Sequence, residues 1–168
     1  MRLIILGAGG YGQTVADLAR QSGKYETVAF LDDNAEGVLG KCGDFAAFAD
    51  GDTEMYPAFG NNAGRLNWLD KLETAGVPVP TIIHTTAYVS PTANIQKGCV
   101  VLPGAIVNTG CLVERGCIIN CGAIVDHGCV IEEGTHVCLG AIVKAENRIP
   151  KCMKIEASQV VENRTYPL

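Results

Sequence analysis

Two histidines in the second half of the chain, His127 and His136, are the residues best suited to move a proton at neutral pH. The unperturbed pKa of histidine, about 6.5, lets the neutral ring take a proton from a nucleophile. The third histidine, His84, stands where we expect a structural role. A metal site needs three convergent ligands, and the histidine spacing is poor for one. We therefore expect acid–base chemistry and no metal; the alternative is that both histidines are ordinary surface residues.

A glycine-rich loop near the start of the sequence is a candidate phosphate site. Residues 2–6 (RLIIL) predict a buried strand, and the run 7–12 (GAGGYG) leads from it into a helix that reaches about residue 22. Free N–H groups and the dipole at a helix N-terminus attract anions, and glycines let a ligand approach the backbone. A second strand over 27–31 ends in Asp32-Asp33, about where dinucleotide-binding proteins carry an acid.

The space before residue 80 favours a smaller ligand than a dinucleotide. A strand over 56–60, Asn61-Asn62 as turn and cap, and a helix with an apolar leucine face complete a second α/β unit. Dinucleotide folds have two mononucleotide halves, and residues 1–80 have room for one. We predict a Rossmann-like domain over 1–80 that binds a nucleotide sugar. NAD binding and a purely structural glycine turn are the alternatives.

A repeat of six residues governs the rest of the chain. From Ile83 to Val161 every sixth residue is isoleucine or valine, and glycine follows three positions later in eight consecutive repeats, Gly98 to Gly140. A short strand followed by a sharp corner has this period, whereas a helix does not. Three strands make one coil, so residues 81–168 predict a parallel β-helix of between four and five coils. After Gly140 the glycines are replaced, and we expect an irregular last coil that caps the stack.

Four of the eight cysteines occupy the small inward position of this repeat: Cys99, Cys111, Cys117 and Cys129. The chain has no C-x-x-C pair. We expect reduced thiols that are buried as small apolar side chains.

The residue before each inward aliphatic residue should face outward, yet six in succession are aliphatic: Val100, Ile106, Leu112, Ile118, Ile124 and Val130. A monomer rarely exposes such a patch. A threefold oligomer would cover it; helices of the first domain are the alternative cover.

The composition excludes some classes of partner. The net charge is −5 with no lysine or arginine cluster, so we expect no nucleic acid. No apolar run has the length of a membrane span and no signal-peptide pattern is present, so we expect no membrane and a cytoplasmic protein.

A half-Rossmann domain, hexapeptide repeats and the sequence Val125-Asp126-His127 together resemble one family. It comprises the bacterial nucleotide-amino-sugar N-acetyltransferases and the related sialic-acid O-acetyltransferases, hexapeptide-repeat acyltransferases with a left-handed β-helix. The matching segments are the glycine loop, LDD (31–33), FGNN (59–62), IIHTTAYVSPTA (82–93), IINCGAIVDHGCVIEEGTHV (118–137) and LGAIV (139–143). The resemblance implies a left-handed coil, acetyl-CoA as co-substrate, and a homotrimer with the acyl site between subunits.

The resemblance also assigns roles to residues. His127 becomes the general base, with Asp126 and Asn120 in the same catalytic segment, and N–H groups at a glycine corner are candidates to stabilise an oxyanion. The nucleotide-sugar residues are Gly7, Gly9, Gly10, Tyr11, Asp32, Asp33, Gly60 and Asn61. The acetyl-CoA residues are His136, Gly140 and Ala145.

We therefore expect an acetyl-CoA-dependent acetyltransferase that acts on a UDP-linked amino sugar in surface-glycan or glycoprotein synthesis. Sugar (sialic acid) O-acetylation is one alternative, because the sequence does not separate amine from hydroxyl acceptors. Another is a sugar-nucleotide-binding protein without acyl transfer. Two features favour this binding-protein alternative: Gly128 stands where some members of the family have an acid, and few coils follow His127. A β-helical metalloenzyme with histidine ligands from two subunits is a further alternative.

Overall fold

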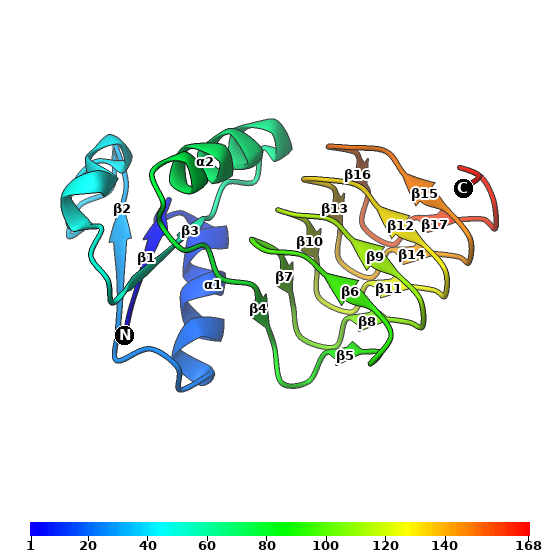
Figure 1. Cartoon of the computed structure of the whole chain (residues 1–168). Coiled ribbons are helices and arrows are strands. Elements are labelled where there is room, and N and C mark those ends of the chain that lie inside the picture. Colours follow the sequence, from blue (N-terminus) through cyan, green and yellow to red (C-terminus); the bar gives the residue numbers. More distant parts are fainter. The chain divides into compact units, whose positions relative to one another are not determined.

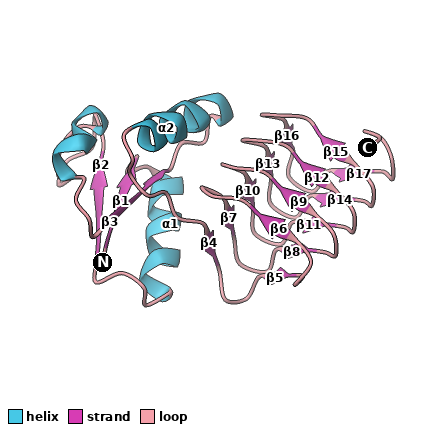
Figure 2. Ribbon diagram, in the orientation of Figure 1, coloured by secondary structure: helices cyan, strands magenta, loops and turns pink.

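The computed structural model describes all 168 residues, which form two compact units, residues 1–82 and 83–168 (Figure 1). The first unit contains the helices, and the second consists of short strands joined by turns (Figure 2). Each unit has a hydrophobic core of its own. No helix in either unit is both long enough and apolar enough to cross a bilayer.

The first unit is a parallel three-stranded sheet in the order β2-β1-β3. Its elements in chain order are β1 (Arg2–Leu6), α1 (Gly10–Gln21), β2 (Thr27–Leu31), the 3-10 helix η1 (Cys42–Phe48), β3 (Thr53–Pro57) and α2 (Asn62–Thr74). Side chains alternate along β1, so Ile4 and Leu6 pack with Leu72 of α2 on one face of the sheet. Leu3 and Ile5 point to the opposite face and are equally buried. Burial on both faces explains why β1 is apolar throughout.

Two predictions for this unit differ in their outcome. The strand expected over 27–31 is β2, as predicted. The strand expected over 56–60 begins earlier, because Thr53 and Glu54 pair with Arg2 and Leu3 of β1. Pro57 is the last paired residue, and residues 58–60 form the loop after the strand.

The second unit is a left-handed parallel β-helix, as predicted. Its two-residue strands are β4 (Ile82–Ile83), β5 (Tyr88–Val89), β6 (Asn94–Ile95), β7 (Val100–Val101), β8 (Ile106–Val107), β9 (Leu112–Val113), β10 (Ile118–Ile119), β11 (Ile124–Val125), β12 (Val130–Ile131), β13 (His136–Val137), β14 (Ile142–Val143), β15 (Arg148–Ile149), β16 (Lys154–Ile155) and β17 (Val160–Val161). They form three sheets, which we call face 1 (β4, β7, β10, β13, β16), face 2 (β5, β8, β11, β14, β17) and face 3 (β6, β9, β12, β15).

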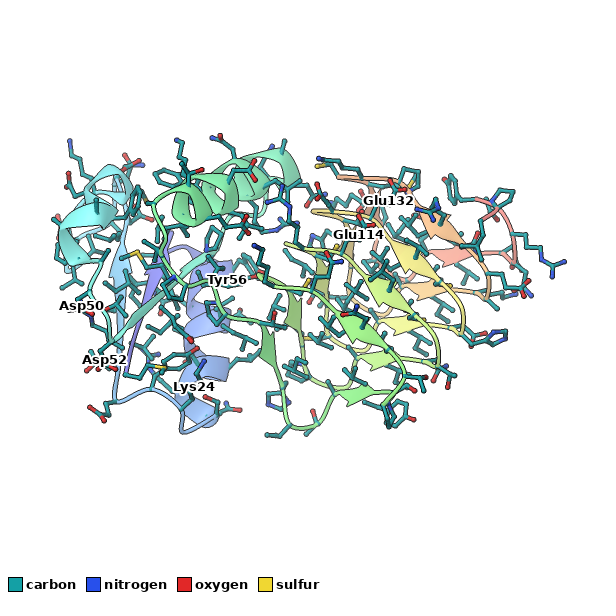
Figure 3. All side chains as sticks on the ribbon, in the orientation of Figure 1. Lys24, Asp50, Asp52, Tyr56, Glu114 and Glu132 are labelled. Carbon is teal, nitrogen blue, oxygen red and sulfur yellow. The ribbon has the colours of Figure 1, made fainter.

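Successive coils are stacked in register, so residues 18 apart in sequence are neighbours, as Ile118 and His136 are. A first corner follows face 1 and contains 120–122, a second follows face 2 and contains 126–128, and a third follows face 3 and contains 132–134. Glu114 and Glu132, labelled in Figure 3, lie one coil apart in the third corner. Residues of the coils that are 18 apart in sequence thus form a line along the β-helix, which we call a column.

The expectation of an irregular last coil is wrong. Strands β14 to β17 keep the register, and the corners keep positive φ without glycine: 59° at Glu146, 57° at Cys152, 60° at Ser158 and 55° at Arg164. The left-handed conformation costs a residue with a Cβ about 1–2 kcal/mol. Bonds to the preceding coil offset this cost, such as that from Ser158 N–H to the Leu139 carbonyl at 2.9 Å.

The cap of the β-helix is the tail after β17. Tyr166 packs against the end of the core. Its N–H donates to the Asn147 side-chain oxygen at 2.9 Å, and its carbonyl accepts from Arg148 N–H at 2.7 Å. The tail thus satisfies backbone groups that an ended coil would leave unpaired.

The prediction that the cysteines of the repeat are buried is confirmed. All eight cysteines are free thiols, and Cys99, Cys111, Cys117 and Cys129 are buried in the core of the β-helix.

The corner conformation predicts opposite effects of two substitutions. Gly110 has a φ of 69°, and a Cβ there would meet nothing within 4 Å, so Gly110→Ala introduces backbone strain alone. We expect a loss of about 1–2 kcal/mol, a fall in Tm of roughly 2–8 °C. Ser158→Gly removes the same strain and should leave Tm unchanged or raise it. Thermal denaturation tests both, and an unchanged Tm for Gly110→Ala would contradict this view of the corners.

Candidate functional site

The carboxyl end of β1 is the position in the first unit that favours a ligand. Strands β2 and β3 lie on opposite sides of β1, so the chain reverses direction across the sheet there. In open parallel sheets, ligands bind in the crevice at such a switch point. The loop after β1 carries Gly7 and Gly9 and leads into Gly10, the first residue of α1, and the loop after β3 contains Gly60.

The glycines of the first loop have three different physical roles. Gly7 turns the chain with a φ of 101°. Gly12 allows close packing, because a Cβ there would lie 2.0 Å from the Gly7 carbonyl oxygen. Gly9 and Gly10 are exposed, and a Cβ on either would meet nothing within 4 Å. Since Gly9 caps α1 without a side-chain hydrogen bond, the N–H groups of the first turn face an open backbone surface.

The two acids after β2 hold the loops of this site in place. Asp32 accepts hydrogen bonds from the N–H groups of Ala8 at 2.7 Å, Asn34 at 2.8 Å and Ala35 at 2.9 Å. These bonds, that from Ala8 foremost, keep the pKa of Asp32 below its usual range. Asp33 accepts from Cys42 N–H at 3.0 Å. Both residues lie at the switch point, and Asp32 fastens the glycine loop to the end of β2.

The remaining residues assigned to this site include two that are engaged within the unit. The Tyr11 hydroxyl, on α1, is 2.8 Å from that of the buried Tyr56 on β3. Asn61 caps α2 by accepting from Gly64 N–H at 2.7 Å, as the cap expected there should. Gly60 is exposed, and a Cβ there would meet nothing within 4 Å. Gly60, with the two exposed glycines of the first loop, therefore provides the open part of the crevice.

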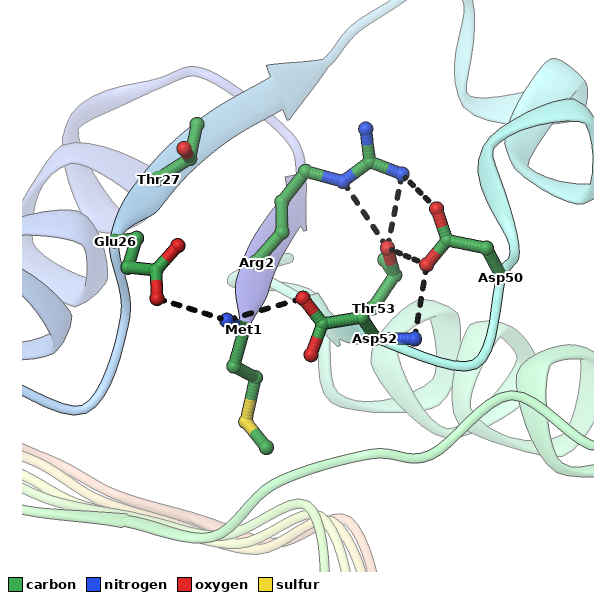
Figure 4. Close-up of a pocket in the computed structure, with 7 residues that line it drawn as sticks. All are labelled: Met1, Arg2, Glu26, Thr27, Asp50, Asp52 and Thr53. Atoms are coloured by element: carbon green, nitrogen blue, oxygen red, sulfur yellow. Dashed lines mark hydrogen bonds and ion pairs between the residues drawn. The ribbon is translucent and has the colours of Figure 1, made fainter.

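A pocket of about 220 Å³ lies at the opposite edge of the sheet, among the amino ends of the strands (Figure 4). Arg2 donates there to Asp50 at 3.0 Å and to Thr53 at 2.9 Å, and the Met1 amino group is 3.1 Å from Asp52. These charges satisfy one another across the pocket. It is also remote from the glycine loop, so it is not the candidate site.

In the β-helix, His127 projects from the second corner with an exposed side chain. Asp126 does not support its ring: the carboxylate accepts from the His127 backbone N–H at 2.7 Å. The same Asp126 oxygen accepts from the Asn108 amide at 3.2 Å. Asn108 is not among the residues predicted from the sequence, although its position 18 residues before Asp126, one coil earlier, places it next to that residue.

Asn120 forms a hydrogen bond with His136 and does not contact His127 as the predicted catalytic group would require. Its side-chain oxygen accepts from Cys121 N–H at 2.8 Å, which turns its NH₂ group toward the His136 Nε2 atom at 2.9 Å. An NH₂ group only donates, so Nε2 is the acceptor and the ring proton is on Nδ1. Asn120 thereby fixes both the orientation and the tautomer of His136.

The two histidines lie in different parts of the β-helix. His127 follows β11 of face 2, and His136 is part of β13 on face 1. The assigned residues divide accordingly. Ala145 is one coil after His127, whose carbonyl accepts from Glu146 N–H at 3.2 Å. Gly140 is one coil after Gly122 in the first corner, and its N–H donates to the Cys121 carbonyl at 2.9 Å. One chain does not bring the two groups together.

The glycine-corner N–H groups are not available for an oxyanion, contrary to the expectation. Gly128 N–H donates to the Thr109 carbonyl at 2.9 Å, and Gly140 N–H is bonded as described. The coil-to-coil ladder uses both. Nowhere in the chain do three or more histidine, cysteine, aspartate or glutamate side chains gather as they would around a metal ion.

Comparisons with known proteins cover both units. The family of the PglD N-terminal domain matches residues 2–72. The acetyltransferase domain of PglB from Neisseria gonorrhoeae FA1090 is 32% identical, with a TM-score of 0.94 over 97% of this chain and 83% of that one. The same domain in complex with acetyl coenzyme A has a TM-score of 0.92, with 32% identity, 97% of this chain and 82% of that one. PerB from Caulobacter crescentus, in complex with CoA and GDP-perosamine, shares the fold at 21% identity, with a TM-score of 0.72 over 100% and 92% of the two chains.

The roles of Gly12 and Gly9 predict contrasting variants. Gly12→Ala places a Cβ 2.0 Å from a backbone oxygen and should prevent the first unit from folding. Gly9→Ala has open space and a φ of −68°, so it should fold normally. The single tryptophan, Trp68, is in α2, and its fluorescence during thermal denaturation reports on this unit. A native unfolding transition in Gly12→Ala would contradict the packing role.

Proposed function

Because the chain belongs to the bacterial nucleotide-amino-sugar N-acetyltransferases and related O-acetyltransferases of the left-handed β-helix superfamily, we propose that it acetylates a nucleotide-linked amino sugar. It is an acyltransferase by family. The acetyl donor is acetyl-CoA, which the PglB relative binds, and the acceptor is the amine of a UDP-linked sugar. The observation that carries the proposal is His127: an exposed histidine on a corner whose backbone is fixed on both sides.

The nucleotide occupies the crevice at the carboxyl end of β1. Gly9 and Gly10 allow the diphosphate to reach the N–H groups at the start of α1, where the helix dipole favours negative charge. Tyr11 and Gly60 border the crevice, and Asp32, Asp33 and Asn61 keep its loops in position. This arrangement supports one mononucleotide, in agreement with a nucleotide sugar.

His127 is the general base. Its neutral ring takes the proton that the sugar amine loses as the amine nitrogen attacks the thioester carbon. The C–N bond forms, the C–S bond breaks, and CoA leaves as the thiol once it receives the proton. Asp126 and Asn108 keep the base in position through its backbone. His136, oriented by Asn120, contacts the thioester region together with Gly140, while Ala145 borders the acyl donor next to His127.

In a homotrimer, the residues around His127 in one subunit lie next to the residues around His136 in another. Face 2 is apolar in every coil: its outward residues are Tyr88, Ile106, Ile124, Ile142 and Val160, with Tyr88 54% and Val160 45% exposed. Val100 and Ile118, two of the six outward aliphatic residues, are buried in the single chain and need no partner. We place face 2 in the subunit interface, so that His127 of one subunit meets His136 of another. The enzyme acts in the cytoplasm, in surface-glycan or glycoprotein synthesis.

The test of function is release of CoA from acetyl-CoA with UDP- and GDP-linked amino sugars, and with sialic acid as a hydroxyl acceptor. We expect turnover with a UDP-linked amine, and His127→Ala should lower kcat by about 10²–10⁴ with little change in KM. His84→Ala, which removes a histidine bonded to Thr86 at 2.8 Å, is the matched control. Full turnover by His127→Ala would remove the proposed base. Calorimetric binding of the sugar nucleotide without CoA binding would favour the binding-protein alternative.

The proposed interface predicts the effect of a charge on face 2. Ile124 is the outward residue of β11, the middle strand of that face, so Ile124→Glu should place a carboxylate in the apolar contact. We expect a mass close to the 17.7 kDa monomer by light scattering, with loss of turnover. Asn94→Glu, on face 3, should keep the mass and activity of the wild type. A trimeric Ile124→Glu would exclude face 2 from the interface.

A further inference from the structure

The inward cysteines of the β-helix are hydrogen-bond donors as well as core residues. Each reaches a backbone carbonyl in the corner of the next coil. The bonds are Cys99 to Glu114 at 3.0 Å, Cys111 to Asp126 at 3.0 Å, Cys117 to Glu132 at 3.1 Å and Cys129 to Lys144 at 3.2 Å. The equivalent Thr135 donates to Pro150 at 2.9 Å, and Asn147 to Glu162 at 2.9 Å. One donor pattern thus connects the coils at the second and third corners.

At some corners the carbonyl has a backbone donor as well: Thr135 N–H donates to the Glu132 carbonyl at 3.2 Å, beside the Cys117 thiol. In the first corner the backbone donor acts without a side-chain donor. The inward residue there is alanine, and its own N–H closes the turn, as from Ala123 to the Asn120 carbonyl at 3.0 Å and from Ala141 to Cys138 at 3.1 Å. A buried carbonyl without a donor is costly. In the second corner the thiol of Cys111 supplies the donor for Asp126. Cysteine at this position therefore has a polar function that its small size alone does not suggest.

The bond from Cys111 falls on the peptide group that precedes His127. The carbonyl of that peptide group, from Asp126, accepts from the Cys111 thiol, and its N–H, from His127, donates to the Asp126 carboxylate at 2.7 Å. The His127 carbonyl accepts from Glu146 N–H at 3.2 Å, and Gly128 N–H donates to the Thr109 carbonyl at 2.9 Å. The side chain of His127 is exposed, so its direction depends on these backbone bonds.

We propose that Cys111 is a positioning residue: its buried thiol fixes the Asp126–His127 peptide group and so aims His127 at its substrate. This rests on the proposed role of His127 as base. Small displacements of a base lower the rate of the chemical step more than they lower substrate affinity. The effect should consequently appear in kcat and not in KM.

The experiment compares three variants of the full chain. Cys111→Ala removes the donor, Cys111→Ser keeps one, and Cys99→Ala removes the same kind of donor from the third corner, at equal depth. Thr135 shows that a hydroxyl can make this bond. We expect Cys111→Ala to lower kcat about three- to tenfold with KM within twofold. Cys111→Ser and Cys99→Ala should stay within twofold of the wild type, with similar losses of Tm in the two alanine variants.

Amide hydrogen exchange provides a second measurement that needs no activity. We expect faster exchange over residues 126–128 in Cys111→Ala, and wild-type exchange there in Cys99→Ala. Equal exchange or equal kcat in the two alanine variants would overturn the proposal, because the thiol would then act on stability alone. If His127→Ala kept full turnover, the proposed function would fall, while exchange would still decide whether the thiol holds this peptide group.

Discussion

The hydrogen bonds between successive coils are the constraint on which the second unit depends. The N–H group of a strand residue donates to the coil that follows, as Val100 does to Cys117 at 3.0 Å and Ile118 to Thr135 at 2.9 Å. Each coil must therefore close after the same number of residues, and each corner must return the chain to register. Positive φ at the corners achieves this, with glycine where the sequence provides it and with Glu146 or Ser158 where it does not. Because no coil can bury its apolar side alone, the stack is stable only as a whole.

The same constraint determines which functional residues meet. Residues that share a column are neighbours, whatever their distance in sequence: Asn108 with Asp126, and Cys111 with Cys129. Residues close in sequence are separated when a strand lies between them, as β11 of face 2 lies between Asn120 in the first corner and Asp126 in the second. The divided arrangement of His127 and His136 follows from this geometry. It is the physical reason for our proposal that the catalytic site includes residues of a second copy of the chain.

The sequence predicts the fold well because its pattern is the physical cause of the fold. The six-residue period identifies the inward residues and the corners, and the structure confirms them. It does not reveal side-chain partners. The Asp126 carboxylate accepts from the His127 backbone N–H, and Asn120 orients His136. Both hydrogen bonds depend on side-chain rotamers, which the six-residue period does not determine.

Two errors of the sequence prediction have physical reasons. The pattern misses the start of β3 because Thr53 and Glu54 are polar, whereas pairing with β1 extends the strand over them. It also predicts an irregular last coil because the corners there lack glycine, although bonds to the preceding coil offset the strain of positive φ. In both places hydrogen bonding between backbone segments overrides the local preference of the side chains.

The proximity of residues in one column also affects the choice between an enzyme and a binding protein. Gly128 follows His127 where an acid could have raised its basicity, and taken alone this glycine favours the binding protein. Gly128 has a φ of 65°, so the corner itself explains why a glycine is there. One coil later the same column carries Glu146, whose Cγ is 3.8 Å from the position of a Cβ on Gly128. Glu146 is held by the guanidinium of Arg164. Because the conformation of this corner favours glycine, Gly128 is explained by the fold and is not by itself evidence for the binding protein.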